Sequence, residues 1–93
     1  MTEIEYLMMK YAHVMRRPVM FPEMAQAIGK DKYLRCSHAL KAMLDKDWMT
    51  ETADPTKHLQ FVYAPTEKGW IEYEENHETH SGAHFVEPIQ GGF

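Results

Sequence analysis

The chain has 93 residues, of which 44% are hydrophobic and 26% are charged, and its formal net charge is −4. A chain of this length has room for one modest hydrophobic core, which excludes large multi-domain enzymes. The sequence lacks the run of about 20 apolar residues that a membrane-spanning helix needs, and its acidic start is unlike a signal peptide. We therefore expect a cytoplasmic protein with no membrane segment. Cys36 is the single cysteine, so no internal disulfide can stabilise the fold.

Charge is distributed unevenly along the chain. Residues 1–50 carry a net charge of +2, whereas residues 51–93 carry −6. Seven Lys and Arg residues against three acids fall between positions 16 and 46, so the field of that segment is locally positive. We expect a polyanion to bind this part of the chain and no other.

A first helix is predicted from Thr2 to Arg16. Thr2 and Glu5 have the spacing of a capping box, in which each side chain satisfies a free backbone amide of the first turn. Proline follows Arg17 and disfavours further helix, while the two arginines suit a helix C-terminus. The apolar residues recur at spacings of three and four and form one stripe, namely Ile4, Leu7, Met8, Tyr11, Ala12 and Met15.

Two further helices are predicted after this one. The second runs from Pro22 to Ile28, because proline fits the first helical turn and Gly29 suits the C-terminal cap. The third ends near Lys46 and has a stripe of Cys36, Leu40, Met43 and Leu44. Two short helices joined by a turn of this length are typical of a helix-turn-helix unit, whose second helix can lie in a DNA groove.

A two-stranded hairpin and a fourth helix follow. Residues 48–52 and 59–64 are rich in aromatic and β-branched residues, and the segment between them contains an Asp-Pro turn starter. Thr66 can cap a helix through about His77. In that helix we expect Gly69 to allow a close backbone approach. The buried side is expected to carry Trp70, Ile71 and Tyr73, and the outer side Glu72, Glu74 and Glu75.

The pattern lapses after this helix into His, Ser, Gly and Pro residues. We therefore predict one domain over residues 1–77 and an extended or disordered tail over residues 78–93.

Two segments resemble the winged helix-turn-helix family, particularly its MarR and PadR-like branches of small bacterial transcription regulators. Leu40–Met49 is similar to the end of the family's recognition helix, with Leu-x-x-Leu before a cap and an apolar strand start. Thr66–Gly69 is similar to the Thr-x-x-Gly that opens the helix after the wing. The resemblance covers about residues 5–75. It implies an α+β, mainly helical fold with three helices, a two-stranded wing and a C-terminal helix, and a bacterial or phage DNA-binding regulator of transcription.

The chain departs from the family pattern at three places. Asp47 stands where the family usually has Gly, although Asp tolerates the left-handed conformation. Pro65 replaces an apolar residue. The long terminal helices through which the MarR branch dimerises have only a short tail in their place, which puts dimerisation in the family manner in doubt.

The resemblance implies that the exposed face of the third helix enters the major groove of double-stranded DNA. With its apolar stripe turned inward, helical geometry turns Arg35, Ser37, His38 and Lys41 outward. Arg35 suits bidentate contacts to guanine, and cations at the helix start favour phosphate. The further expected contacts are Lys30, Lys32 and Tyr33 at the helix start, Arg16 and Arg17 after the first helix, and Lys57 and His58 at the wing tip.

A protein-binding winged-helix module remains the alternative, for example a phage or mobile-element inhibitor of a host complex. It would use the acidic fourth helix, the tail, or a Met-rich surface of Tyr6, Met9 and Met20. A homodimer built on the first and fourth helices also remains open.

Neither an enzyme nor a cofactor is expected, because no phosphate-binding loop, nucleophile elbow or HExxH motif occurs. His77, His80 and His84 have a spacing that suits a metal only if the last helix continued through Gly82, so we interpret them as residues of a solvated tail.

Overall fold

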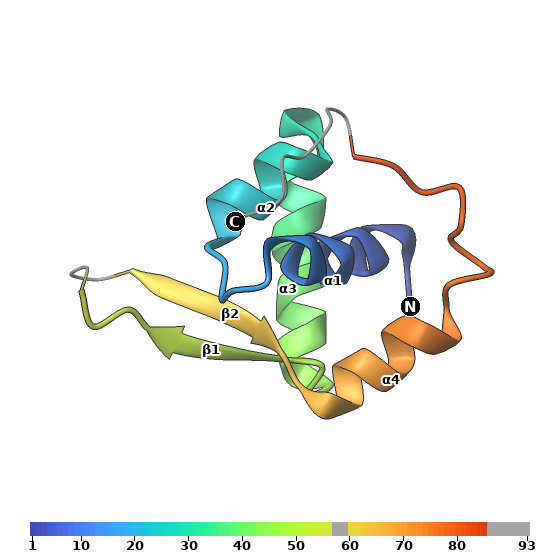
Figure 1. Ribbon diagram of the computed structural model, residues 1–93. Helices are drawn as coiled ribbons and strands as arrows, with labels where there is room; N and C mark the ends of the chain where they lie inside the picture. Colours follow the sequence, from blue (N-terminus) through green and yellow to red (C-terminus); the bar gives the residue numbers. More distant parts are fainter. Residues whose placement is uncertain (57–59, 86–93) are drawn as a thin grey trace.

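Figure 1 shows the computed structural model, which describes residues 1–56 and 60–85. Its elements are α1 (Glu3–Met15), α2 (Phe21–Ile28), the 3₁₀ turn η1 (Lys30–Lys32), α3 (Tyr33–Asp45), β1 (Met49–Ala53), β2 (Phe61–Pro65) and α4 (Glu67–Glu75). The predicted α+β, mainly helical class is confirmed. The order of the elements is compatible with a winged-helix-like layout.

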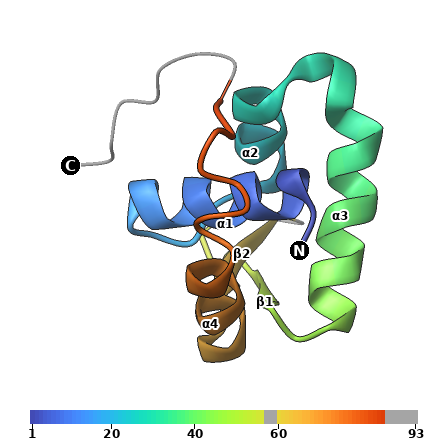
Figure 2. The ribbon, with the colours of Figure 1, turned by 90° about the vertical axis from the view of Figure 1, so that its right-hand side faces the viewer.

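The first helix occupies the middle of the fold, and α2, α3 and α4 all pack against it (Figure 2). Its predicted capping box is present, because the Thr2 hydroxyl accepts from the Glu5 amide at 3.2 Å and the Glu5 carboxylate accepts from the Thr2 amide at 2.8 Å. Burial extends beyond the predicted stripe to Tyr6 and Met9. The expectation that these two residues form a Met-rich binding surface with Met20 is therefore wrong, since α1 is covered on more than one side.

The third helix buries Cys36, Leu40 and Met43 as predicted. It ends at a left-handed Asp47 with φ 61°, and the amide of Trp48 donates to the carbonyl of Met43 at 2.8 Å. The prediction that aspartate can take the place of a capping glycine is confirmed here.

The sheet joins β1 and β2 in antiparallel register, with Met49 opposite Pro65 and Ala53 opposite Phe61. This hairpin matches the predicted one to within one residue at both ends of β1 and at the end of β2, whereas β2 begins two residues later than predicted. The linker between α1 and α2 adds an unpredicted contact on the other edge of β2. There the amide of Val19 donates to Tyr63 at 2.9 Å, and the amide of Tyr63 donates back at 2.7 Å. The linker is thus fixed to the hairpin.

The fourth helix begins as predicted, with the Thr66 hydroxyl accepting from the Gly69 amide at 3.0 Å. Gly69 lies directly against the carbonyl of Trp48, where a side chain would not fit. Ile71 is 51% exposed, so the expectation that it is buried is wrong. It lies two positions from the buried Tyr73, and residues two apart point to opposite sides of a helix.

Residues 78–82 form turns, and residues 83–85 continue without regular structure along α1, where an extended or disordered tail was expected. His80 Nε2 lies 2.9 Å from the carbonyl oxygen of Met1. Ala83 is buried, and the Phe85 ring meets the Tyr11 ring edge to face. The predicted tail beyond residue 85 lies outside the described residues. Within the described parts of the chain, no helix combines the length and the apolar character needed to cross a membrane.

Candidate nucleic-acid interface

The outward side of α3 carries the polar residues that the sequence predicts for it. Arg35, Ser37, His38 and Lys41 are all exposed, while the opposite side of the helix is buried. None of these four side chains has a hydrogen bond or an ion pair with another described residue. Figure 2 shows α3 at the edge of the molecule, with its outer side uncovered by the other elements. This side is therefore free to meet a partner.

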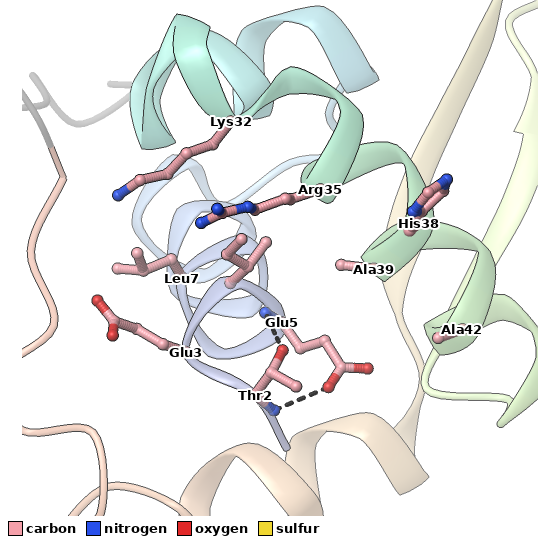
Figure 3. Close-up of a pocket in the computed structure, with 10 residues that line it drawn as sticks. Thr2, Glu3, Glu5, Leu7, Lys32, Arg35, His38, Ala39 and Ala42 are labelled. Carbon is pink, nitrogen blue, oxygen red and sulfur yellow. Dashed lines mark hydrogen bonds between the residues drawn. The ribbon is translucent and has the colours of Figure 1, made fainter.

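The four side chains do not all point the same way. Arg35 and Lys32 extend over a groove of about 520 Å³ between α3 and the start of α1. His38 also lines this groove, but its ring is directed away from α1 (Figure 3). Ala39 and Ala42 form the α3 wall of the groove, and Glu3 lines its α1 side. Arg35 therefore lies at the α1 edge of the candidate interface, and the groove it lines also carries the acidic Glu3.

Lys30 and Lys32 belong to the 3₁₀ turn before α3, where Lys30 is exposed and Lys32 is half-buried. Tyr33 is 53% exposed, and its ring meets the Phe21 ring edge to face with 5.0 Å between centroids. Tyr33 is therefore held against α2 while one side of its ring remains accessible.

The two arginines after α1 differ in how their charges are used. Arg16 is exposed and left-handed, with φ 55°. Arg17 is exposed but forms a salt bridge with Glu23, with 2.7 Å between its nitrogen and the carboxylate oxygen. Arg16 therefore presents a cation that has no ion-pair partner in residues 1–56 and 60–85, whereas the charge of Arg17 is largely offset.

Glu23 is the centre of a hydrogen-bond network that fixes α2 to α1. Its carboxylate accepts from the Tyr11 hydroxyl at 2.7 Å, from Arg17 at 2.7 and 3.1 Å, and from the Met20 amide at 2.8 Å. Desolvation raises the pKa of Glu23, but these hydrogen bonds together outweigh it, so the pKa is lowered from its ordinary value of 4.5. Burial, together with the bond to Glu23, raises the pKa of Tyr11 to about 12.

The described part of the β1–β2 hairpin, which is the expected wing, carries no Lys or Arg. It has two acids instead, Glu51 and Asp54. Glu51 accepts a hydrogen bond from the Tyr63 hydroxyl at 2.8 Å, and burial followed by this bond raises the pKa of Tyr63 to about 12. The predicted phosphate contacts Lys57 and His58 lie outside the described residues.

The structure adds a buried acid that the sequence did not single out as buried. Glu5 is 3% exposed, and its Oε2 lies 3.7 Å from Nζ of Lys46 at the end of α3. This Oε2 has no hydrogen-bond donor among the described residues. Lys46 Nζ also lies 4.5 Å from the centroid of the Trp48 ring. The ion pair thus connects the first turn of α1 to the last turn of α3.

Leu34 is a second residue that the sequence analysis missed. It is 67% exposed, the highest value among the large hydrophobic side chains that the structure describes. Its exposure follows from the sequence, because Leu34 lies two positions before Cys36 and so falls on the opposite side of the helix from the buried stripe. An apolar residue therefore stands among the polar ones on the outer side of α3.

The remaining candidates have other partners. The Cys36 thiol is fully buried, and burial raises its pKa, so it remains a protonated apolar core residue. His77 and His80 contact the hydroxyl of Tyr6 and the carbonyl of Met1, respectively. Among the residues that the structure describes, no three His, Cys, Asp or Glu side chains are grouped to hold a metal ion.

Comparison with known proteins gives no match, since no family model fits the chain and no curated protein or solved structure is significantly similar to it. Any function assigned to this surface must therefore be argued from its own side chains.

Proposed function

We propose that the chain is a winged-helix DNA-binding protein, with α3 as the recognition helix and the β1–β2 hairpin as the wing. The observation that carries this proposal is the outward side of α3, where Arg35, Ser37, His38 and Lys41 are exposed and unpaired among the described residues. Such side chains match the donor and acceptor pattern of the major groove and the charge of the flanking phosphates.

The framework behind α3 supports the same proposal. Cys36, Leu40 and Met43 fix the inner side of the helix in the core, so the outer side chains start from a rigid element. The short turn from α2 through η1 matches the helix-turn-helix arrangement. The Val19 contact with Tyr63 covers the outer edge of β2 and so holds the hairpin beside the helices.

A site-specific protein of this kind acts by occupying its duplex site and excluding other proteins, which is the simplest form of transcription regulation. The proposal does not need a dimer. The enclosed position of α1 leaves little of that helix for a dimer contact, so the outer side of α4 would have to supply it.

The test is a selection from random duplexes, followed by binding measurements at several salt concentrations. We expect Arg35→Ala to reduce specific affinity by about 1–3 kcal/mol if Arg35 contacts a base pair. Lys41→Ala should weaken all duplexes similarly and reduce the salt slope by about one if Lys41 contacts phosphate. The matched control is Lys68→Ala, which removes one exposed cation from α4. Enrichment of no sequence at low salt would falsify the proposal.

A second candidate function is a protein-binding module that uses α4. The observation that favours it is Ile71, which is 51% exposed on an element whose Glu67, Glu74 and Glu75 are also exposed. An apolar residue within an acidic surface suits a basic protein partner. Affinity capture with wild type, with Ile71→Ser and with Glu74 and Glu75 changed to Gln tests this candidate. Unchanged recovery of the same partner by all three proteins would remove it.

A further inference from the structure

Leu34 is exposed in a way that the fold does not explain. Its neighbour Tyr33 packs against Phe21, whereas Leu34 is not among the hydrophobic residues that pack on the described core. Single exposed hydrophobic residues are common on protein surfaces, so exposure alone is not informative. What distinguishes Leu34 is its position on the molecule.

Leu34 shares the centre line of the outer side of α3 with His38 and Lys41. The spacing from Leu34 is four and seven residues, which places the three side chains along one line of a helix. Leu34 is also the second residue of α3, and the first residues of a recognition helix are those that contact base edges. It therefore lies where a base edge would be met, at the front of the interface.

The major groove of DNA presents one apolar group to a protein side chain. Every base edge there presents hydrogen-bond donors or acceptors, and thymine alone adds a C5-methyl group. Most neighbours of Leu34 are cations and hydrogen-bonding groups, which suit phosphates and polar base edges, and the exposed Asp31 three positions before it is the acid among them. Leu34 can make neither kind of contact, so its complement within a duplex is the methyl group.

We infer that Leu34 contacts the C5-methyl of a thymine and makes the protein select duplex sites with thymine at that position. This inference rests on the proposed function and adds a specificity-determining residue to it. It also predicts discrimination against double-stranded RNA, whose bases lack this methyl and whose major groove is too deep and narrow for side chains to read.

The experiment replaces thymine by deoxyuridine, one position at a time, in a duplex enriched by the random selection. Removal of the methyl group leaves every hydrogen-bonding group of the base in place. We expect one position at which wild type binds the thymine duplex about four times more tightly, the factor that corresponds to burial of one methyl-sized group. Leu34→Ala should bind the two duplexes equally, because it lacks the side chain that meets the methyl.

The matched control is Ile71→Ala, which truncates another exposed aliphatic residue on a different helix and should keep the wild-type ratio. Circular dichroism of all three proteins checks that they are folded, which we expect because both substitutions are at exposed helix positions. A ratio near one at every position in wild type, with duplex affinity intact, overturns the inference alone. A ratio that persists in Leu34→Ala also overturns it. Failure of wild type to bind any duplex overturns the proposed function as well.

Discussion

Two regions of the molecule differ in hydrogen bonding. Polar groups are paired at the junction between the end of α3 and the start of α4, whereas polar side chains on the outer side of α3 are unpaired among the described residues. At the junction, the Thr66 hydroxyl donates to the carbonyl of Asp47 at 2.5 Å, and the Thr66 amide donates to Trp48 at 3.0 Å. On the outer side of α3, the side chains of Arg35, His38 and Lys41 have no such partners among the described residues. Substitutions at the junction should therefore change stability, whereas those on the outer side of α3 should change binding.

The largest effect should come from Gly69→Ala, because a methyl group at this position would overlap the backbone carbonyl of Trp48. Backbone atoms cannot rotate aside as a side chain can, so we expect the free energy of unfolding to fall by about 3 kcal/mol. Urea denaturation measures the change. Lys68→Ala, at the preceding exposed position, should stay within about 0.5 kcal/mol of wild type. Equal stability of wild type and Gly69→Ala would mean that the junction is looser than the distances indicate.

The hydrogen-bond network around Glu23 is a second fully paired site, and it should make the stability of the protein depend on pH. The pKa of Glu23 is lowered in the folded chain, so its contribution to stability is present above its ordinary pKa of 4.5 and is lost as the pH falls through the folded value. Glu23→Gln should lower the free energy of unfolding at pH 7 by about 2 kcal/mol, since it removes charged hydrogen bonds.

Denaturation from pH 7 to pH 2 measures this effect. The curves of wild type and Glu23→Gln should converge toward low pH. The matched control, Glu74→Gln, changes an exposed carboxylate of α4 and should follow wild type throughout. A constant difference between wild type and Glu23→Gln at every pH would contradict the role of the charge.

Asp47 gives a smaller effect whose sign depends on the substitution. Its φ of 61° is easy for glycine and costly for a residue with a β-carbon. Asp47→Gly should raise the free energy of unfolding by about 0.5 kcal/mol, and Asp47→Ala should lower it by about 1 kcal/mol. Thermal denaturation of the pair is the measurement. Destabilisation by both substitutions would show that the Asp47 side chain, and not its backbone, stabilises the cap.

Local rules predicted the helices and their ends well. The capping box of Thr2 and Glu5, the cap at Asp47 and the Thr66 hydroxyl bond all depend on residues close in sequence, and each is present. The orientation of α3 was also predictable, because a buried stripe at Cys36 and Leu40 fixes which side chains face outward.

Long-range contacts were not predictable in the same way. Tyr6 is covered by the rings of Tyr73, His77 and His80, and the pairing of Val19 with Tyr63 joins segments 44 positions apart. Periodicity within one helix says nothing of what covers its second side. For the candidate interface, the sequence predicted exposure of the α3 side chains. It did not predict the salt bridge that offsets Arg17 or the acid that lines the same groove as Arg35.

The acid that lines this groove is Glu3, and its substitution should have the smallest effect on duplex binding. Glu3 is exposed and lines the same groove as Arg35 and Lys32, so its charge repels a phosphate that approaches them. Glu3→Gln should raise duplex affinity about twofold at low salt, and the gain should disappear as salt screens the charge. Fluorescence anisotropy at two salt concentrations measures both. Glu75→Gln removes the same charge from the exposed side of α4 and should leave affinity almost unchanged; equal gains from the two variants would show that net charge alone, and not this groove, governs binding.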